Sequence, residues 1–281
     1  MTGSLQNLFL EWDVPPAVTC VLLLTALVYM RGWVRIRETR AELFPAWRLV
    51  CFLSGVFALF AAVASPLDTF SESLLIMHMG QHFVFISVAP PLLLLGAPVV
   101  PLLRGLPSWI VRPLLGPILR TPLIRQIAKF LIQPQVAWIA MNLSFVAWHI
   151  PKAYEFALSS EFWHNIEHFC FFGTSVLFWW PVMEPWPYRP RNARWVLIPY
   201  LLLADFVNTA VSAFLCFAGR LLYPSYGEIP RLFGLSALND QIAAGAFMWV
   251  FGSVVFLVPA IAITAQLLSG TRQSSFRPAV T

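Results

Sequence analysis

Apolar residues gather in long runs along this chain, and short polar or basic links separate the runs. A helix needs roughly 17 to 25 mostly apolar residues to cross a bilayer. We expect transmembrane helices at about 14–30, 47–64, 72–95, 134–150, 162–181, 195–217 and 240–268. The segment at about 102–133 instead interleaves basic residues with leucine and isoleucine, which is typical of an amphipathic piece at the membrane interface. The pattern predicts an all-α polytopic helix bundle with seven transmembrane helices, forming one integral membrane domain over residues 1–281.

Composition supports a membrane protein. Hydrophobic residues make up 59% of the chain and charged residues 11%, whereas about 25% of a soluble domain is charged. The cysteines are scattered through apolar stretches without a CxxC pair, so they predict neither a disulfide framework nor a thiol redox motif. The first apolar run lacks a basic segment ahead of it, and we expect no removable signal peptide.

The basic residues predict the orientation of the bundle. The formal net charge of +5 would suggest a nucleic-acid partner in a soluble protein. In a membrane protein, lysine and arginine instead indicate which links lie in the cytoplasm. We therefore expect no nucleic-acid partner. With the N-terminus outside and the C-terminus in the cytoplasm, the outer links hold three basic residues, Lys152, Arg220 and Arg231. The remaining 15 of the 18 lie on the cytoplasmic side, as the positive-inside rule expects.

The histidines converge at one depth of this topology. His78 and His82 share a helix face in the third span, because residues four apart lie about 40° apart around the axis. His164 and His168 repeat that spacing at the start of the fifth span, and His149 ends the fourth. Ionisable groups inside a membrane are costly and usually functional, and imidazole is a common metal ligand. The predicted ligands for copper or zinc are His78, His82, His149, His164, Glu167, His168 and Asp240.

Several alternatives remain open. The sequence HxxEH at 164–168 occurs in inverted zinc peptidases, so an intramembrane zinc hydrolase is one of them, with Ser87 and Asp240 as further candidates in a ceramidase-like site. A b-type haem site or a metal-free scaffold are others. Asp205 and Asn208 fit either function or helix association. Met77, Met79, Cys170 and Cys216 are soft-ligand candidates for which packing is the simpler role.

Several motifs, in order, resemble one family. They are HMGQH at 78–82, APPLLLLGAP at 89–98, WHIPKAYEFAL at 148–158, HNIEHFCFF at 164–172, FWWP at 178–181 and DQIAAGAFMW at 240–249. The chain resembles the multi-spanning CtaG family of caa3-type cytochrome c oxidase assembly factors. One departure is the sequence Phe83, Val84, Phe85, where the family is expected to be richer in methionine, and this weakens the prediction that thioethers assist Cu(I) binding.

The resemblance implies a non-enzymatic assembly factor in the bacterial plasma membrane. Its partners would be cytochrome c oxidase subunits and an extracytoplasmic copper chaperone. Its motifs select the same seven residues that topology selected. We therefore predict that the outward-facing histidines bind copper and support its delivery to a haem-copper oxidase by ligand exchange.

Overall fold

The computed structural model describes residues 12–188, 193–230 and 232–274, and within these ranges every element is helical. The N-terminal residues 1–11, on which the prediction about a signal peptide depends, lie outside the described residues. So do Arg189, Arg191, Arg231 and Arg277, four of the basic residues used to predict orientation.

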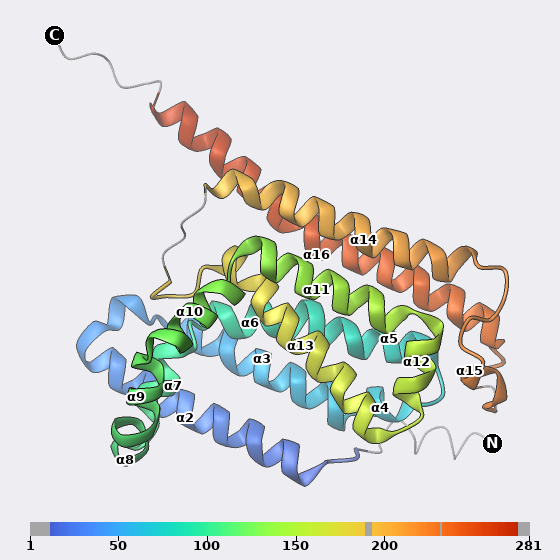
Figure 1. The fold of residues 1–281 in the computed structure, drawn as a ribbon, viewed down its shortest axis with the longest axis horizontal. Coiled ribbons are helices and arrows are strands. Elements are labelled where there is room, and N and C mark those ends of the chain that lie inside the picture. The colour runs from blue at the N-terminus through green and yellow to red at the C-terminus, as the bar shows by residue number, and fades with distance from the viewer. Residues whose placement is uncertain (1–11, 189–192, 231, 275–281) are drawn as a thin grey trace.

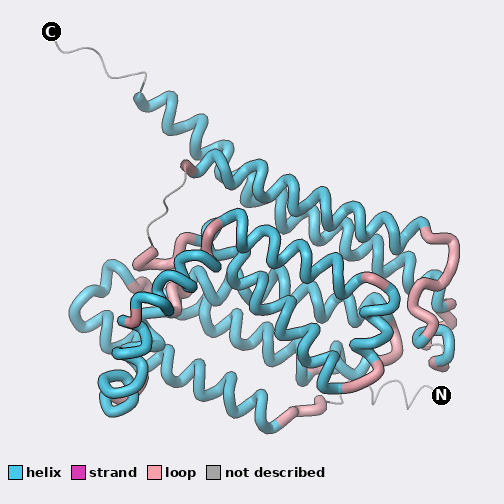
Figure 2. Tube along the Cα trace, in the orientation of Figure 1, coloured by secondary structure: helices cyan, strands magenta, loops and turns pink. Residues whose placement is uncertain are grey.

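Long helices lie side by side and form the body of the molecule (Figures 1 and 2). They are α2 (Pro16–Arg40), α3 (Ala46–Ala64), α5 (Leu75–Phe83) with its continuation through η2 (Val84–Val88) and α6 (Ala89–Leu95), α11 (Pro134–His149), α13 (Glu161–Met183), α14 (Leu197–Phe217) and α16 (Ala237–Ser274). Large apolar side chains such as Phe206, Phe217 and Leu143 are exposed on the outside of this bundle. Such a surface suits lipid better than water.

Short helices collect at the two ends of the bundle (Figure 1). One end carries α4 (Pro66–Ser71), α12 (Pro151–Leu158) and α15 (Ser225–Glu228). The opposite end carries α7 (Val99–Gly105), α8 (Ser108–Ile110), η3 (Val111–Leu115), α9 (Gly116–Arg120) and α10 (Pro122–Leu131). The further short turns are η1 (Ala41–Leu43) and η4 (Arg194–Val196).

Five helices of the described chain are long and apolar enough to cross a membrane, against the seven predicted. They are Pro16–Leu43, Ala46–Ala64, Leu75–Leu95, Arg194–Phe217 and Ala237–Ser269. The pair α10 and α11, bent by 65°, makes a sixth if it counts as one span. Helix α11 alone has 16 residues, and α13 carries His164, Asn165, Glu167 and His168, which lower its hydropathy. The all-α fold is therefore confirmed, whereas seven spans are not.

The third predicted span crosses two prolines without ending. Proline usually kinks or ends a helix, yet the segment Leu75–Leu95, which contains Pro90 and Pro91, is a single candidate span. A proline nitrogen carries no hydrogen, so Pro90 cannot bond the carbonyl of Ile86 four residues earlier. A π-helical turn, η2, lies at this point, and the indole nitrogen of Trp179 donates to Ile86 O at 2.9 Å. Thus α13 replaces the hydrogen bond that the proline removes.

Polar contacts join α14 to α16. Asp205 accepts a hydrogen bond from the Ser253 hydroxyl at 2.7 Å, and Asn208 donates to Met248 O at 3.3 Å. A Cβ atom added at Gly252 would lie 2.5 Å from the Asn208 side chain, so the two helices approach closely because this residue is glycine. These contacts support helix association as the role of Asp205 and Asn208.

Candidate metal centre

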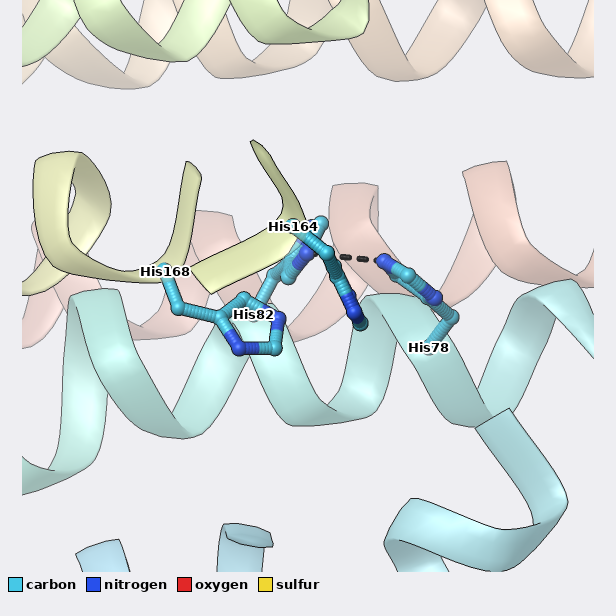
Figure 3. A group of neighbouring side chains, drawn as sticks. All are labelled: His78, His82, His164 and His168. Atoms are coloured by element: carbon cyan, nitrogen blue, oxygen red, sulfur yellow. Dashed lines mark hydrogen bonds between the residues drawn. The ribbon is translucent and has the colours of Figure 1, made fainter. Parts of the chain in front are cut away.

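Two helices bring four of the predicted histidines together. His78 and His82 project from α5, and His164 and His168 project from α13 toward them (Figure 3). One ring nitrogen of each histidine can be chosen so that all four lie within 4.8 Å of one another. We call this group the four-histidine cluster. It arises because both helices carry histidine at i and i+4 and turn these faces toward each other.

Hydrogen bonds fix the orientation of His78. The Tyr226 hydroxyl lies 2.9 Å from Ser71 O, which can only accept, and 3.1 Å from His78 Nδ1. Because the phenol has one hydrogen and gives it to Ser71 O, His78 Nδ1 must be the donor to Tyr226. The lone pair of His78 then lies on Nε2, which is 2.9 Å from His82 Nε2. His82 Nε2 can donate its hydrogen to this lone pair, and a metal ion bound between the two rings would take the place of that hydrogen.

Glu167 adds a carboxylate to the cluster. Its side chain is completely buried, and Oε1 lies 3.9 Å from His82 Nε2. Neither carboxylate oxygen has a hydrogen-bond partner within the described part of the chain. A buried carboxylate without hydrogen bonds is strongly unfavourable unless it takes up a proton or a positive charge compensates it. The donor set of four imidazoles and one carboxylate therefore fits a metal ion.

The other two predicted ligands do not belong to this group. His149 donates from Nδ1 to Phe145 O at 2.7 Å, and its ring centroid is 6.2 Å from that of His82. Asp240 instead caps α5, because its two oxygens accept from the backbone nitrogens of Leu75 at 2.7 Å and Ile76 at 3.1 Å. Of the seven predicted residues, the structure thus brings together the four-histidine cluster and Glu167, with His149 beside them and Asp240 holding the helix.

Sequence reasoning missed the tyrosines beside the cluster. Tyr226 lies 148 positions from His78, and its hydroxyl also lies 3.2 Å from that of Tyr154. Burial raises the pKa of Tyr226 above its ordinary value and does the same for Tyr154, so both phenols keep their hydrogens. The motif WHIPKAYEFAL contains Tyr154, but no local pattern links Tyr226 to a histidine so far away.

A large acidic cavity leads to the cluster from the end that carries α4, α12 and α15. Its volume is about 920 Å³, and His78, His164 and His168 form part of its wall. We call it the acidic vestibule, because its lining contains no lysine or arginine among the described residues and five carboxylates: Asp13, Asp68, Glu72, Glu155 and Glu161. Burial, more than the nearby Glu72, raises the pKa of the Asp68 carboxyl, although a hydrogen bond from Gln81 opposes the shift. A cavity of this charge attracts cations.

Comparison with known proteins gives the family. The chain is 24% identical to an uncharacterized protein of Mycobacterium leprae, over 94% of this chain and 40% of that protein. It is also 24% identical to uncharacterized proteins of Mycobacterium bovis and Mycobacterium tuberculosis, over 97% of this chain and 45% of each. The chain thus spans less than half the length of these curated relatives. No solved structure matches it. Residues 27–269 match the cytochrome c oxidase caa3 assembly factors (Caa3_CtaG), and the chain belongs to that family.

Proposed function

We propose that this assembly factor binds copper at the four-histidine cluster and supports its delivery to a haem-copper cytochrome c oxidase. The observation that carries the proposal is the convergence of four imidazoles on a buried Glu167 whose oxygens have no hydrogen-bond partner among the described residues. Membership in the oxidase assembly family supplies the biological context. Copper is then cargo, and transfer is an exchange of ligands without catalysis of a covalent reaction.

The donor set suits a transferable copper ion. Neutral imidazoles bind copper in either common oxidation state, and the Irving–Williams order favours copper over other divalent ions at such ligands. Hydrogen bonding from His78 Nδ1 to Tyr226 orients the ring and leaves its Nε2 for the metal. His164 and His168 also form part of the vestibule wall, so a partner's ligand can approach the ion from that side. An accessible flank is what a ligand-exchange mechanism requires.

The acidic vestibule provides a route for the cargo. Its carboxylates concentrate cations in front of the cluster, and they bind copper more weakly than imidazole does. An ion therefore moves toward better ligands as it passes inward. In the proposed orientation this end faces outward, with seven membrane-crossing helices in the bacterial plasma membrane. The partners would be an extracytoplasmic copper chaperone and the oxidase subunits.

Metal analysis of single histidine variants tests the proposal. We expect copper in the purified wild-type protein after growth with copper, and at least a tenfold loss in His78→Ala and in His168→Ala. Both variants should also lower oxidase activity in the cell while the protein stays inserted and abundant. Phe169→Ala is the matched control, because Phe169 follows His168 on α13 but is 71% exposed. Normal copper content and normal oxidase activity in both histidine variants would refute the proposal.

A zinc hydrolase is the second candidate, and Glu167 favours it. The HxxEH pattern brings His164, His168 and the Glu167 carboxylate into one site, where such a carboxylate could activate zinc-bound water. Copper delivery and hydrolysis differ in the role of this residue. A hydrolase requires that wild-type protein retain zinc and that Glu167→Gln, with zinc still bound, lose turnover of a lipid amide or peptide. Copper retention by the wild type without such turnover would exclude it.

A further inference from the structure

We propose a second copper site, specific for Cu(I), in a small cavity on the other side of His82. This inference rests on the proposed function, because it assigns a second position to the same cargo. The cavity lies between α5, α11, α14 and α16, and its free volume is about 30 Å³. We call it the methionine chamber, because Met79, Met141 and Met248 line it together with His82 and His149.

The three methionines come from three different helices. Met79 belongs to α5, Met141 to α11 and Met248 to α16, and they are 1%, 4% and 6% exposed. The sequence favoured a packing role for Met79, because it points away from the His78 face. The structure places it on the wall of a cavity that also contains thioethers from two other helices. Thioether sulfur is a soft, polarisable ligand that favours Cu(I) over harder ions.

Two imidazole nitrogens at the chamber have no hydrogen-bond partner among the described residues, although both rings are at least nine-tenths buried. His149 donates from Nδ1 to Phe145 O, so its lone pair lies on Nε2, and that atom is without a partner. His82 Nδ1 is also without a partner. Buried polar groups are normally hydrogen-bonded. Both residues line a cavity large enough for an ion, and their unpartnered nitrogens are an observation independent of the methionines.

His82 connects the two sites. Its Nε2 lies 2.9 Å from His78 Nε2 in the four-histidine cluster, whereas its ring also lines the methionine chamber. The chamber wall contains no carboxylate among the described residues, and the vestibule wall contains five. From vestibule to cluster to chamber, the candidate ligands therefore change from carboxylates, to four imidazoles with the Glu167 carboxylate, to three thioethers with two imidazoles. This order selects for a soft monovalent ion and against zinc or calcium at the last position.

The transfer step requires no change of oxidation state. Copper stays Cu(I) throughout, bonds from copper to cluster imidazoles break, and bonds to thioether sulfur and to His149 Nε2 form. No proton needs to leave, because thioethers bind as neutral ligands and His149 already carries its hydrogen on Nδ1. The step is favourable to the extent that Cu(I) prefers sulfur to nitrogen. The chamber would then hold the ion among helices and away from the vestibule.

Cu(I) titration and X-ray absorption test the second site. The whole protein, purified in detergent under reducing conditions, is titrated with Cu(I) against a chromophoric chelator. The wild type should bind two equivalents, and its spectrum should contain sulfur scattering. The triple variant Met79→Leu/Met141→Leu/Met248→Leu removes the chamber thioethers with little change in volume. It should bind one equivalent and lose the sulfur scattering.

The control removes three other methionines. Met30→Leu/Met77→Leu/Met183→Leu deletes the same number of thioethers, and none of these residues lines the chamber. It should keep two equivalents and the sulfur scattering. A wild type that binds one equivalent with nitrogen scattering alone would overturn the second site and leave the cluster intact, with water as the chamber's occupant. If the chamber variant fails to accumulate, the number of equivalents and the sulfur scattering of the wild type still show whether the second site exists. Failure to bind copper at all would overturn both proposals.

Discussion

At the scale of single residues, Tyr226 determines how the cluster presents its nitrogens. Its hydroxyl contacts His78 Nδ1, Ser71 O and the hydroxyl of Tyr154. Outer hydrogen-bond partners fix the tautomer and ring orientation of metal-binding histidines. Tyr226 comes from the connection between α14 and α16, which thereby contributes to a site built on α5 and α13.

Tyr226→Phe should weaken copper binding without unfolding the protein. Loss of the hydroxyl removes one of the contacts that hold His78 Nδ1, so Nε2 is held less firmly toward the cluster. Changes at such outer partners cost about 10- to 100-fold in metal affinity, and Cu(I) competition titration measures the loss. Tyr200→Phe is the matched control, because its buried hydroxyl donates to Phe178 O at 2.8 Å and does not contact the four-histidine cluster. Equal affinities in both variants would show that Tyr226 does not orient His78.

The sequence predicts the histidines of the cluster better than it predicts their hydrogen-bond partners. The spacing of His78 from His82 and of His164 from His168 defines a shared helix face by geometry alone, so these four residues could be named in advance. Contacts over 148 positions, such as that from Tyr226 to His78, depend on how loops return to the bundle. Asp240 was also predicted as a ligand, because it is a carboxylate at the same depth in the membrane as the histidines. These properties do not distinguish a metal ligand from a helix cap.

At the scale of elements, Asp240 joins the start of α16 to the start of α5. The first backbone nitrogens of a helix have no partner within it, and a carboxylate also interacts favourably with the helix dipole there. Asp240 supplies both effects to Leu75 and Ile76 from 165 and 164 positions away. His78 follows within one turn. The cap therefore fixes the end of α5 that carries His78.

Asp240→Asn should therefore destabilise the fold and weaken metal binding together. Replacing a charged cap costs about 2 kcal/mol, which predicts a melting temperature lower by several degrees for a chain of this size. Asp205→Asn is the control, because Asp205 also accepts a hydrogen bond from another helix but lies away from the cluster. It should lower stability with unchanged copper affinity. Loss of affinity in Asp240→Asn with an unchanged melting temperature would instead indicate a direct ligand.

Helix boundaries show where local patterns fail. Backbone chemistry alone predicts that a helix kinks or ends at a proline such as Pro90, and this rule takes no account of a donor from another helix. Trp179 supplies that donor to Ile86 O, and η2 absorbs the change in backbone geometry. Helix α2 likewise continues to Arg40, beyond the predicted end of its span near Met30. Hydropathy ends a span at the membrane boundary, whereas the helix itself ends where its hydrogen bonds end.

At the scale of the whole molecule, the two ends of the bundle differ in charge. The vestibule end is lined by carboxylates, and the opposite end carries the α7–α10 segment, with Arg104, Arg112, Arg120, Arg125 and Lys129. Positive residues concentrate on the cytoplasmic side of membrane proteins. The sequence could predict this asymmetry because it depends on residue counts. It could not establish the number of crossings, because α11 is short and α13 is polar at its beginning.

Cysteine labelling determines how many of these helices cross. Gln126 in α10, Lys152 in α12 and Asn239 near the start of α16 are all exposed and mark the connections around α11, α13 and α14. Single cysteines at these positions, in a background with the native cysteines replaced by alanine, are treated with a membrane-impermeant maleimide on intact spheroplasts.

If α11, α13 and α14 all cross, Gln126 and Asn239 lie on opposite faces of the membrane, because the chain changes sides with each crossing. We expect Lys152→Cys and Asn239→Cys to react from outside, and Gln126→Cys to react only after permeabilisation. If α13 entered and left the membrane on one face, Lys152→Cys would still react from outside, but Asn239→Cys would be protected. If α11 failed to cross, Lys152→Cys would be protected together with Gln126→Cys. The first pattern alone is consistent with seven crossings and a vestibule that opens outward.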